Sequence, residues 1–319
     1  MTTTTRSRFQ RIALLALGAL LVTVGLTRLS ATIASAFTGG AALSNTVLYD
    51  ETFSVAAGEH LAVDLGSEAV TVRTGSGTRA RVVVEGDGRD AAREFERRRF
   101  SAHADDGLVV RTDPPRRLFS WGRRDARFQV TVEIPRRFDA TVDVGSGAVE
   151  VESLDGDLVV DTGSGAVRVD DVTGKRVRID TGSGSVQAGR LEGDVEIDTG
   201  SGSVRVERVD GSLSVDTGSG SVSVDLVDGP AEIDTGSGGV RVALASRDAV
   251  DIDTGSGGVA LVLPTLGFNV DLEGSRVEID EALGFRGDRE RDRAEGTLGS
   301  GGPLVVVDTG SGNVRLDAR

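Results

Sequence analysis

One tripeptide, Gly-Ser-Gly, constrains the fold of this 319-residue chain more than any other feature, because it recurs at a nearly fixed spacing of 18 or 19 residues. A fixed period of this length is typical of repeat architectures, in which each unit stacks on its neighbours. The last gap spans 55 residues and contains Gly274-Ser275, so we expect degenerate units to fill it. Within this series the tripeptide begins at Gly145, Gly163, Gly182, Gly200, Gly218, Gly236, Gly255 and Gly310.

Apolar and polar residues alternate on both sides of each tripeptide. Val177, Ile179 and Thr181 share one side of an extended chain, while Arg178 and Asp180 share the other. A period of two indicates strands, and strands this short and rich in glycine cannot form independent hairpins. Successive units must therefore pair with each other. We predict an all-β fold, a parallel β-solenoid (β-helix), with equivalent strands stacked about 4.8 Å apart.

The unit Asp-Thr-Gly-Ser-Gly recurs from Asp161 onward, and its first two residues point in opposite directions. We expect the threonines to face the interior corner, where their hydroxyls can satisfy backbone groups. The aspartates face water, where stacked carboxylates repel each other by about 1 kcal/mol per neighbouring pair. These acidic residues are Asp161, Asp180, Asp198, Asp216, Asp234 and Asp253.

Two compensations for this repulsion stay open. Each carboxylate can accept hydrogen bonds from the glycine and serine amides of its own corner, as in an Asx turn. Alternatively, Ca²⁺ ions bind along the column, since carboxylate oxygens suit this hard cation. One carboxylate per corner supplies few ligands, which counts against calcium. No other cofactor is expected.

The strand that follows each corner presents a different surface. Its first outward position holds a small residue in every unit, and its second is mixed in charge, with Glu150, Gln187 and Ser223 among arginines. Flat, nearly neutral sides of solenoids bind extended polymers or partner proteins in many repeat folds. We predict a binding face that contains Arg168, Arg205 and Arg241.

Residues 1–37 have the pattern of an export segment. Three arginines precede a run from Ile12 to Leu26 that is apolar except for Thr23, and Ala34-Ser35-Ala36 follows as a cleavage pattern. The alternative is an uncleaved membrane anchor through residues 12–36, with its basic end inside. Either way, we expect the rest of the chain to be exported to the cell envelope, anchored and facing outward, or secreted.

Residues 44–140 alternate like strands but lack the 18-residue register, and residues 89–100 have the pattern of a short amphipathic helix. We interpret this section as a β-rich cap on one open end of the solenoid, which itself spans residues 141–319. Residues 281–303 are expected to form a loop between late coils. A basic and aromatic loop is a second candidate contact for a membrane surface or an anionic polymer. It contains Arg116, Arg117, Phe119, Trp121, Arg123 and Arg124.

Composition excludes several classes of function. The chain has no cysteine and two histidines, so disulfides, thiolate nucleophiles and cysteine-type metal sites are ruled out. Residues 141–319 hold 34 acidic and 16 basic side chains, a balance that repels nucleic acid. Because acids recur as a uniform ladder and Lys175 is the one lysine, we expect no catalytic residues.

The Asp-Thr-Gly-Ser-Gly units, the export segment and the valine-rich region with its short helix resemble the putative-adhesin family of exported β-strand-repeat proteins of the bacterial envelope. The resemblance covers residues 46–319. It implies a β-helix and a surface role, and it implies no catalytic site. We expect a non-catalytic envelope or cell-surface scaffold that binds a polysaccharide or an envelope protein. The alternatives are a β-helix related to polysaccharide lyases or hydrolases and a calcium-stabilised surface spacer.

Overall fold

A computed structural model describes residues 46–88, 90–112 and 126–319. These residues form strands joined by short turns, with one α-helix, so the predicted all-β fold is confirmed. The predicted export segment (1–37) and most of the basic and aromatic loop, including all six of its named residues, lie outside the described residues. Among the described residues, no helix is long and apolar enough to cross a membrane.

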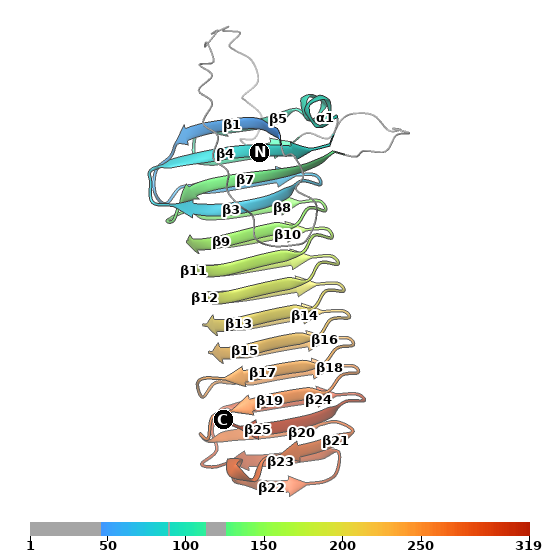
Figure 1. Cartoon of the computed structure of the whole chain (residues 1–319). Coiled ribbons are helices and arrows are strands. Elements are labelled where there is room, and N and C mark those ends of the chain that lie inside the picture. Colours follow the sequence, from blue (N-terminus) through green and yellow to red (C-terminus); the bar gives the residue numbers. More distant parts are fainter. Residues whose placement is uncertain (1–45, 89, 113–125) are drawn as a thin grey trace, which may run out of the picture. The chain divides into compact units, whose positions relative to one another are not determined.

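The repeat units form coils that lie directly on one another, and each coil bends at its Gly-Ser-Gly corner (Figure 1). In β11 (Val167–Thr181) and β12 (Val186–Thr199), the strand after one corner runs on into the strand before the next. In the coils from Gly145 to Gly255, the other strands before a corner are β8 (Asp139–Val144), β10 (Leu158–Thr162), β14 (Leu213–Thr217), β16 (Ala231–Thr235) and β18 (Val250–Thr254). Those after a corner are β9 (Val149–Asp155), β13 (Val204–Asp210), β15 (Val222–Asp228), β17 (Val240–Leu244) and β19 (Val259–Leu263).

Equivalent residues of neighbouring coils pair in parallel. Asp161 lies opposite Asp180 and Thr162 opposite Thr181, and the same register continues from coil to coil. The inward valines, isoleucines and leucines are almost fully buried, as Ile179 and Val186 illustrate. Burying each such side chain contributes about 1.5–3 kcal/mol, so a continuous apolar ladder holds the stack together.

The coil register also extends into the N-terminal section. β2 (His60–Leu65) and β3 (Ala69–Gly75) form a coil that pairs in parallel with β8 and β9, with Asp64 opposite Asp143. β6 (Leu108–Thr112) and β7 (Arg127–Pro135) stack on the other side of this coil. The order of coils in the stack therefore differs from their order in the chain.

Antiparallel strands and the helix close this end. β4 (Arg79–Asp87) pairs with β7, β1 (Thr46–Ser54) pairs with β4, and β5 (Phe100–Ala104) pairs with β6. The predicted helix is present as α1 (Ala91–Arg97), which contacts β4 and β1. Phe95 on α1 packs against Phe100 and Phe128, with ring centroids 5.5 and 6.3 Å away.

The C-terminal end corrects the expectation for the 55-residue gap. β24 (Leu304–Thr309) and β25 (Asn313–Ala318) stack directly on β18 and β19, while β20 (Phe268–Glu273) and β21 (Arg276–Ile279) stack on the far side of β24 and β25. One degenerate coil, with its bend at Gly274-Ser275, therefore does lie in this interval of the chain, but it stacks beyond the coil of Gly310 and not between those of Gly255 and Gly310. The coil of β24 and β25 contains the complete Asp-Thr-Gly-Ser-Gly unit, so its Asp308 and Thr309 pair with Asp253 and Thr254. Residues 268–279 lack this unit and cannot form the same pairs.

The expectation of a loop at residues 281–303 is also wrong. This segment forms a 3₁₀ helix, η1 (Glu281–Leu283), and an antiparallel hairpin of β22 (Phe285–Arg289) and β23 (Arg293–Leu298). β23 pairs with β20 and so covers the outer edge of the last coil. The charged residues that suggested a loop include the exposed side chains of β22. This strand lies at an edge, and its short length and its charge protect it from pairing with another chain.

Candidate functional site

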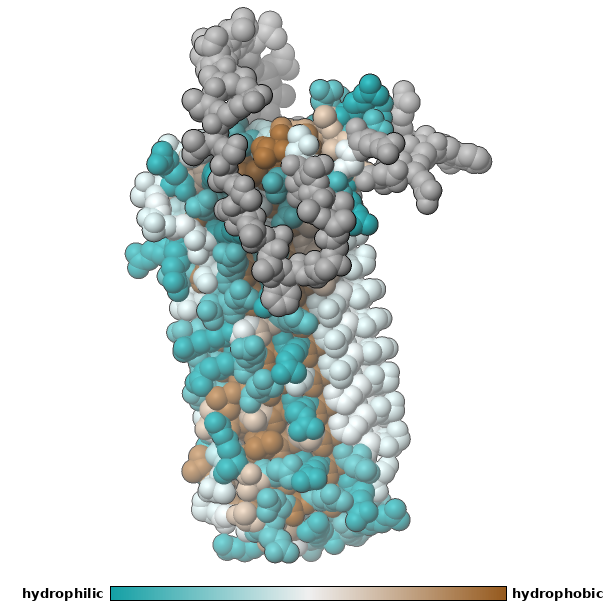
Figure 2. All heavy atoms as spheres, in the orientation of Figure 1, coloured by the Kyte–Doolittle hydropathy of each residue, from teal (hydrophilic) through white to brown (hydrophobic). Residues whose placement is uncertain are grey.

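The Thr-Gly-Ser-Gly corner is a structural element of each coil. Thr181 is buried, and its hydroxyl accepts a hydrogen bond from the amide of Gly184 (3.0 Å) and donates one to the carbonyl of Gly165 in the previous coil (3.3 Å). A Cβ atom on Gly184 would lie 1.8 Å from that carbonyl oxygen, so only glycine fits. This confirms the predicted role of the threonines. The space-filling view shows a pale strip of intermediate hydropathy along the edge where Figure 1 draws the turns (Figure 2).

The predicted acidic column exists and is longer than expected. The six aspartates pair in register, outward and at least partly exposed, from Asp161 to Asp253. Burial together with neighbouring aspartates raises the pKa of Asp198 and of Asp234 above the ordinary value. The column is extended at both ends by Asp64, Asp143, Asp308 and Glu273.

Hydrogen bonds from the corner amides do not compensate for this repulsion, which corrects the predicted Asx turn. The amide of Gly182 donates to the carbonyl of Thr162 (3.1 Å), and the amide of Gly184 donates to the hydroxyl of Thr181. Both glycine amides are therefore already engaged by threonines. Within residues 46–319, outside the two undescribed stretches, no group of three or more acidic or histidine side chains could hold a metal ion. The calcium hypothesis for the column stays a prediction.

The predicted arginines lie together on the opposite sheet. Arg168 pairs with Gln187, and Gln187 pairs with Arg205 in the next coil. The valines beside Arg168 are buried, so its side chain points outward and is 61% exposed, like that of Arg205. Arg241 is exposed and continues the same column two coils beyond Arg205.

A shallow depression of about 650 Å³ lies on this face between Arg168 and Arg205. It forms at Gly189, which has no side chain where the coils on either side carry Asp170 and Glu207. Arg241 does not line it. The structure therefore places Arg168 and Arg205 at one depression and Arg241 outside it, and their role in binding stays a prediction.

Two further arginines line the depression and were missed. Arg190 and Arg208 pair in register, and each forms an ion pair of 2.6 Å with Asp210. Hydrogen bonds from Arg208 and Arg190 hold the pKa of Asp210 below its usual range. The sequence could have identified them, because the two arginines occupy the same position of successive units.

A family model described as Toastrack DUF4097 matches residues 59–317, which is most of the chain. The chain belongs to the Toastrack family. This match confirms the family resemblance inferred from the repeat units.

Several solved structures are similar to this Toastrack chain. One is described as a putative lipid binding protein from Parabacteroides distasonis, with 12% identity over 84% of this chain and 96% of that one, and a TM-score of 0.42. A putative adhesin from Bacteroides fragilis has 10% identity over 85% and 96%, with a TM-score of 0.38. Another from Parabacteroides distasonis has 12% identity over 86% and 98%, with a TM-score of 0.37. A comparison with curated proteins found no match. Because the identities and TM-scores are this low, no ligand of these proteins is assigned to the Toastrack chain.

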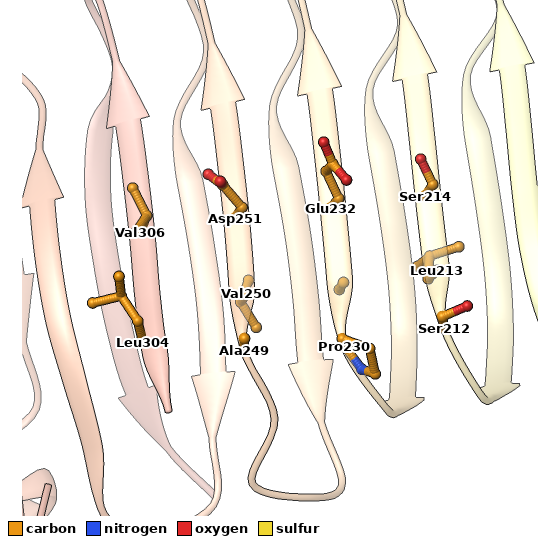
Figure 3. Close-up of a pocket in the computed structure, with 11 residues that line it drawn as sticks. Ser212, Leu213, Ser214, Pro230, Glu232, Ala249, Val250, Asp251, Leu304 and Val306 are labelled. Atoms are coloured by element: carbon orange, nitrogen blue, oxygen red, sulfur yellow. The ribbon is translucent and has the colours of Figure 1, made fainter. Parts of the chain in front are cut away.

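The acidic sheet of the Toastrack chain also carries an apolar groove of about 420 Å³ (Figure 3). One outward position holds Ser212, Pro230, Ala249 and Leu304 in successive coils, and Leu304 is 48% exposed. Glu232 and Asp251 lie at the same groove. Sequence reasoning missed it because Leu304 reaches this position only through the out-of-order stacking of β24 on β18.

Proposed function

We propose that this Toastrack chain is a non-catalytic scaffold of the cell envelope, which binds an extended polymer on the face that contains Arg168, Arg205 and Arg241. One observation carries the proposal: the depression between Arg168 and Arg205 is lined by four arginines, which outnumber its three carboxylates, and it lies beside a column of small residues. Such a face can approach a polymer closely, and its arginines can bind carboxylates or sulfates with two hydrogen bonds each.

The distribution of acids supports a role in binding rather than catalysis. General acid–base or nucleophilic chemistry needs a particular pair of groups in a pocket, with environments that differ from one another. The aspartates of the column instead repeat the same environment from coil to coil. A polysaccharide lyase or hydrolase, the alternative class, would break this uniformity at one coil.

The location in the envelope rests on the export segment at residues 1–37 and on the family. An exported repeat protein can present a long face outside the cell, either tethered by residues 12–36 or released by cleavage. Fractionation of the producing cells, followed by determination of the N-terminal residue of the mature chain, distinguishes these two states.

A glycan array and a pull-down with envelope extract test the binding function. We expect the wild-type protein to bind a ligand that the Arg168→Gln, Arg205→Gln, Arg241→Gln variant no longer binds. The matched control is Arg286→Gln, Arg289→Gln, Arg291→Gln, which removes the same charge from exposed positions in or beside β22. No binding by the wild-type protein in either assay would contradict the proposal. Incubation with uronate polymers tests the enzyme alternative, because new unsaturated or reducing ends would show cleavage.

A further inference from the structure

The arginines of the binding face recur in every second coil. From coil to coil, one outward column reads Arg168, Gln187, Arg205, Ser223, Arg241, Ala260 and Arg315. Arg315 joins this series because β25 stacks on β19, which puts it opposite Ala260 although the two are far apart in the chain. The four arginines are named here the arginine comb.

The spacing and the length of the arginine comb follow from the stacking. Strands lie about 4.8 Å apart, so arginines in alternate coils are separated by roughly 9.6 Å. The whole comb is therefore roughly 29 Å long. Acidic residues bound it, because Glu150 precedes Arg168 in the column and Glu278 follows Arg315. The positive charges of this column are therefore regularly placed and limited to these seven coils.

A strip of small residues lies beside the arginine comb, at the outward position two residues earlier in each strand. Ser185, Ser203 and Ser221 occupy the three successive coils in its middle, and Ala166 and Gly239 flank them. Small side chains let a ligand approach the backbone, and serine hydroxyls both donate and accept hydrogen bonds. This strip suits a hydroxyl-rich chain that runs along the stack.

The arginines of the comb already have acidic neighbours, but these pairs are weak. Arg168 pairs with Asp170 (3.3 Å), Arg205 with Asp225 (3.4 Å) and Arg315 with Asp317 (2.8 Å). All three arginine side chains are more than 60% exposed. Exposed ion pairs contribute only about 0.2–1 kcal/mol each, so a bidentate ligand carboxylate or sulfate can replace them.

We propose that the arginine comb binds a linear polysaccharide with one carboxylate or sulfate per disaccharide, aligned with the stacking direction. The proposal rests on the binding function above and names its ligand class. Two strand spacings are close to the length of an extended disaccharide, so each anionic group of such a polymer meets one arginine. An extended peptide does not match, because its side chains recur on one side every 6.6 Å or so.

Hyaluronan oligosaccharides, with one carboxylate per disaccharide, are the probe, and binding is measured by calorimetry at fixed ionic strength. We expect Arg205→Gln to weaken binding about tenfold, the effect of losing roughly 1.4 kcal/mol of interaction. The decisive variant is Gln187→Arg, Arg205→Gln, which keeps the number of arginines and moves one of them by a single coil. We expect it to bind as weakly as Arg205→Gln, whereas the control Arg286→Gln binds like the wild-type protein.

The two proposals fail in different ways. If the moved arginine binds hyaluronan as tightly as the wild-type protein does, spacing is irrelevant and the arginine comb is overturned. Equal affinity for neutral dextran, or capture of a protein ligand in place of hyaluronan at these arginines, also overturns the comb and leaves the binding function standing. If the wild-type protein binds no glycan and no protein, the binding function itself fails.

Discussion

Thr199 donates a hydrogen bond from its hydroxyl to the carbonyl oxygen of Gly184 in the preceding coil, at 3.3 Å. The same hydroxyl accepts from the amide of Gly202 at 3.0 Å, within its own corner. A single buried oxygen atom thus connects two coils and completes a turn. Because this arrangement recurs along the stack, the corner chemistry specifies register as well as stability.

Thr199→Val is expected to destabilise the protein by about 1–3 kcal/mol, because valine keeps the shape and leaves the buried amide of Gly202 and carbonyl of Gly184 without this partner. Urea denaturation measures the free energy of unfolding. Ser201→Ala, in the same corner but exposed, is the control and should change it little. A Thr199→Val variant as stable as the wild-type protein would show that the hydroxyl has no structural role.

Gly257 and Gly258 are adjacent but differ in the space around them. A Cβ atom on Gly257 would lie 1.9 Å from the carbonyl oxygen of Gly238, whereas one on Gly258 has no neighbour closer than 3.6 Å. We expect Gly257→Ala to cost more than about 3 kcal/mol, since the backbone of two coils must separate. Gly258→Ala should stay within about 1 kcal/mol of the wild type. Thermal melting of both variants checks this, and equal melting temperatures would refute the close stacking.

The acidic column makes stability depend on pH. The pKa of Asp198 is raised by burial and by Asp180 and Asp216, so its ionisation in the folded state opposes folding. The contribution of Asp198 to the stability of the fold is most favourable at a pH below its ordinary pKa of 3.8, and it is lost as the pH rises through the raised pKa of the folded state. Asp198→Asn should therefore raise the melting temperature at pH 7 by about 2–4 °C at low salt, the equivalent of about 1 kcal/mol. The gain should disappear at pH 3 and shrink in salt.

Asp210 provides the control of opposite sign. Arg208 and Arg190 lower its pKa, so its charge stabilises the fold at neutral pH and this contribution is lost as pH falls through the lowered value. Asp210→Asn should lower the melting temperature at pH 7. If the two aspartate variants shifted stability in the same direction at pH 7, the electrostatic assignment of the two sheets would be wrong.

Local patterns predicted the coil but not the order of the coils. Thr181 and Arg168 were placed correctly because the alternation in a strand determines which side faces inward. The position of Arg315 in the arginine comb could not be predicted, because it depends on β25 stacking on β19 rather than on the chain segment next to it. Any coil with the right alternation can pair with any other, so non-local matching of corners decides the order.

Removal of residues 313–319 tests this order. β25 lies between β19 and β21, and its Val314 and Leu316 are fully buried, so the truncation removes an internal strand. We expect a loss of several kcal/mol, at about 1.5–3 kcal/mol for each buried side chain, and rapid proteolysis within residues 268–303. Deletion of β1, an edge strand, should leave residues 268–303 resistant. A truncated chain with unchanged proteolysis would contradict the placement of β25.

Calcium should have no specific effect on stability. Stacked aspartates offer each cation at most one carboxylate from each coil, while Ca²⁺ prefers six to eight oxygen ligands. We expect the same melting temperature with calcium and with a chelator at equal ionic strength. A calcium-dependent increase that magnesium does not reproduce would support the calcium-stabilised spacer instead.

Like corners lie on one another, one coil per strand spacing, and the corner of Gly310 lies next to that of Gly255. The chain has no cysteine, so pairs of spin labels can be placed at the corner serines through Ser→Cys variants. Distances from Ser146 should grow by about 4.8 Å per coil to Ser201, Ser237 and Ser256, and the label at Ser311 should lie one coil beyond Ser256. Distances that do not grow in proportion, or a Ser311 label three coils beyond Ser256, would contradict the stacked order and the arginine comb that depends on it.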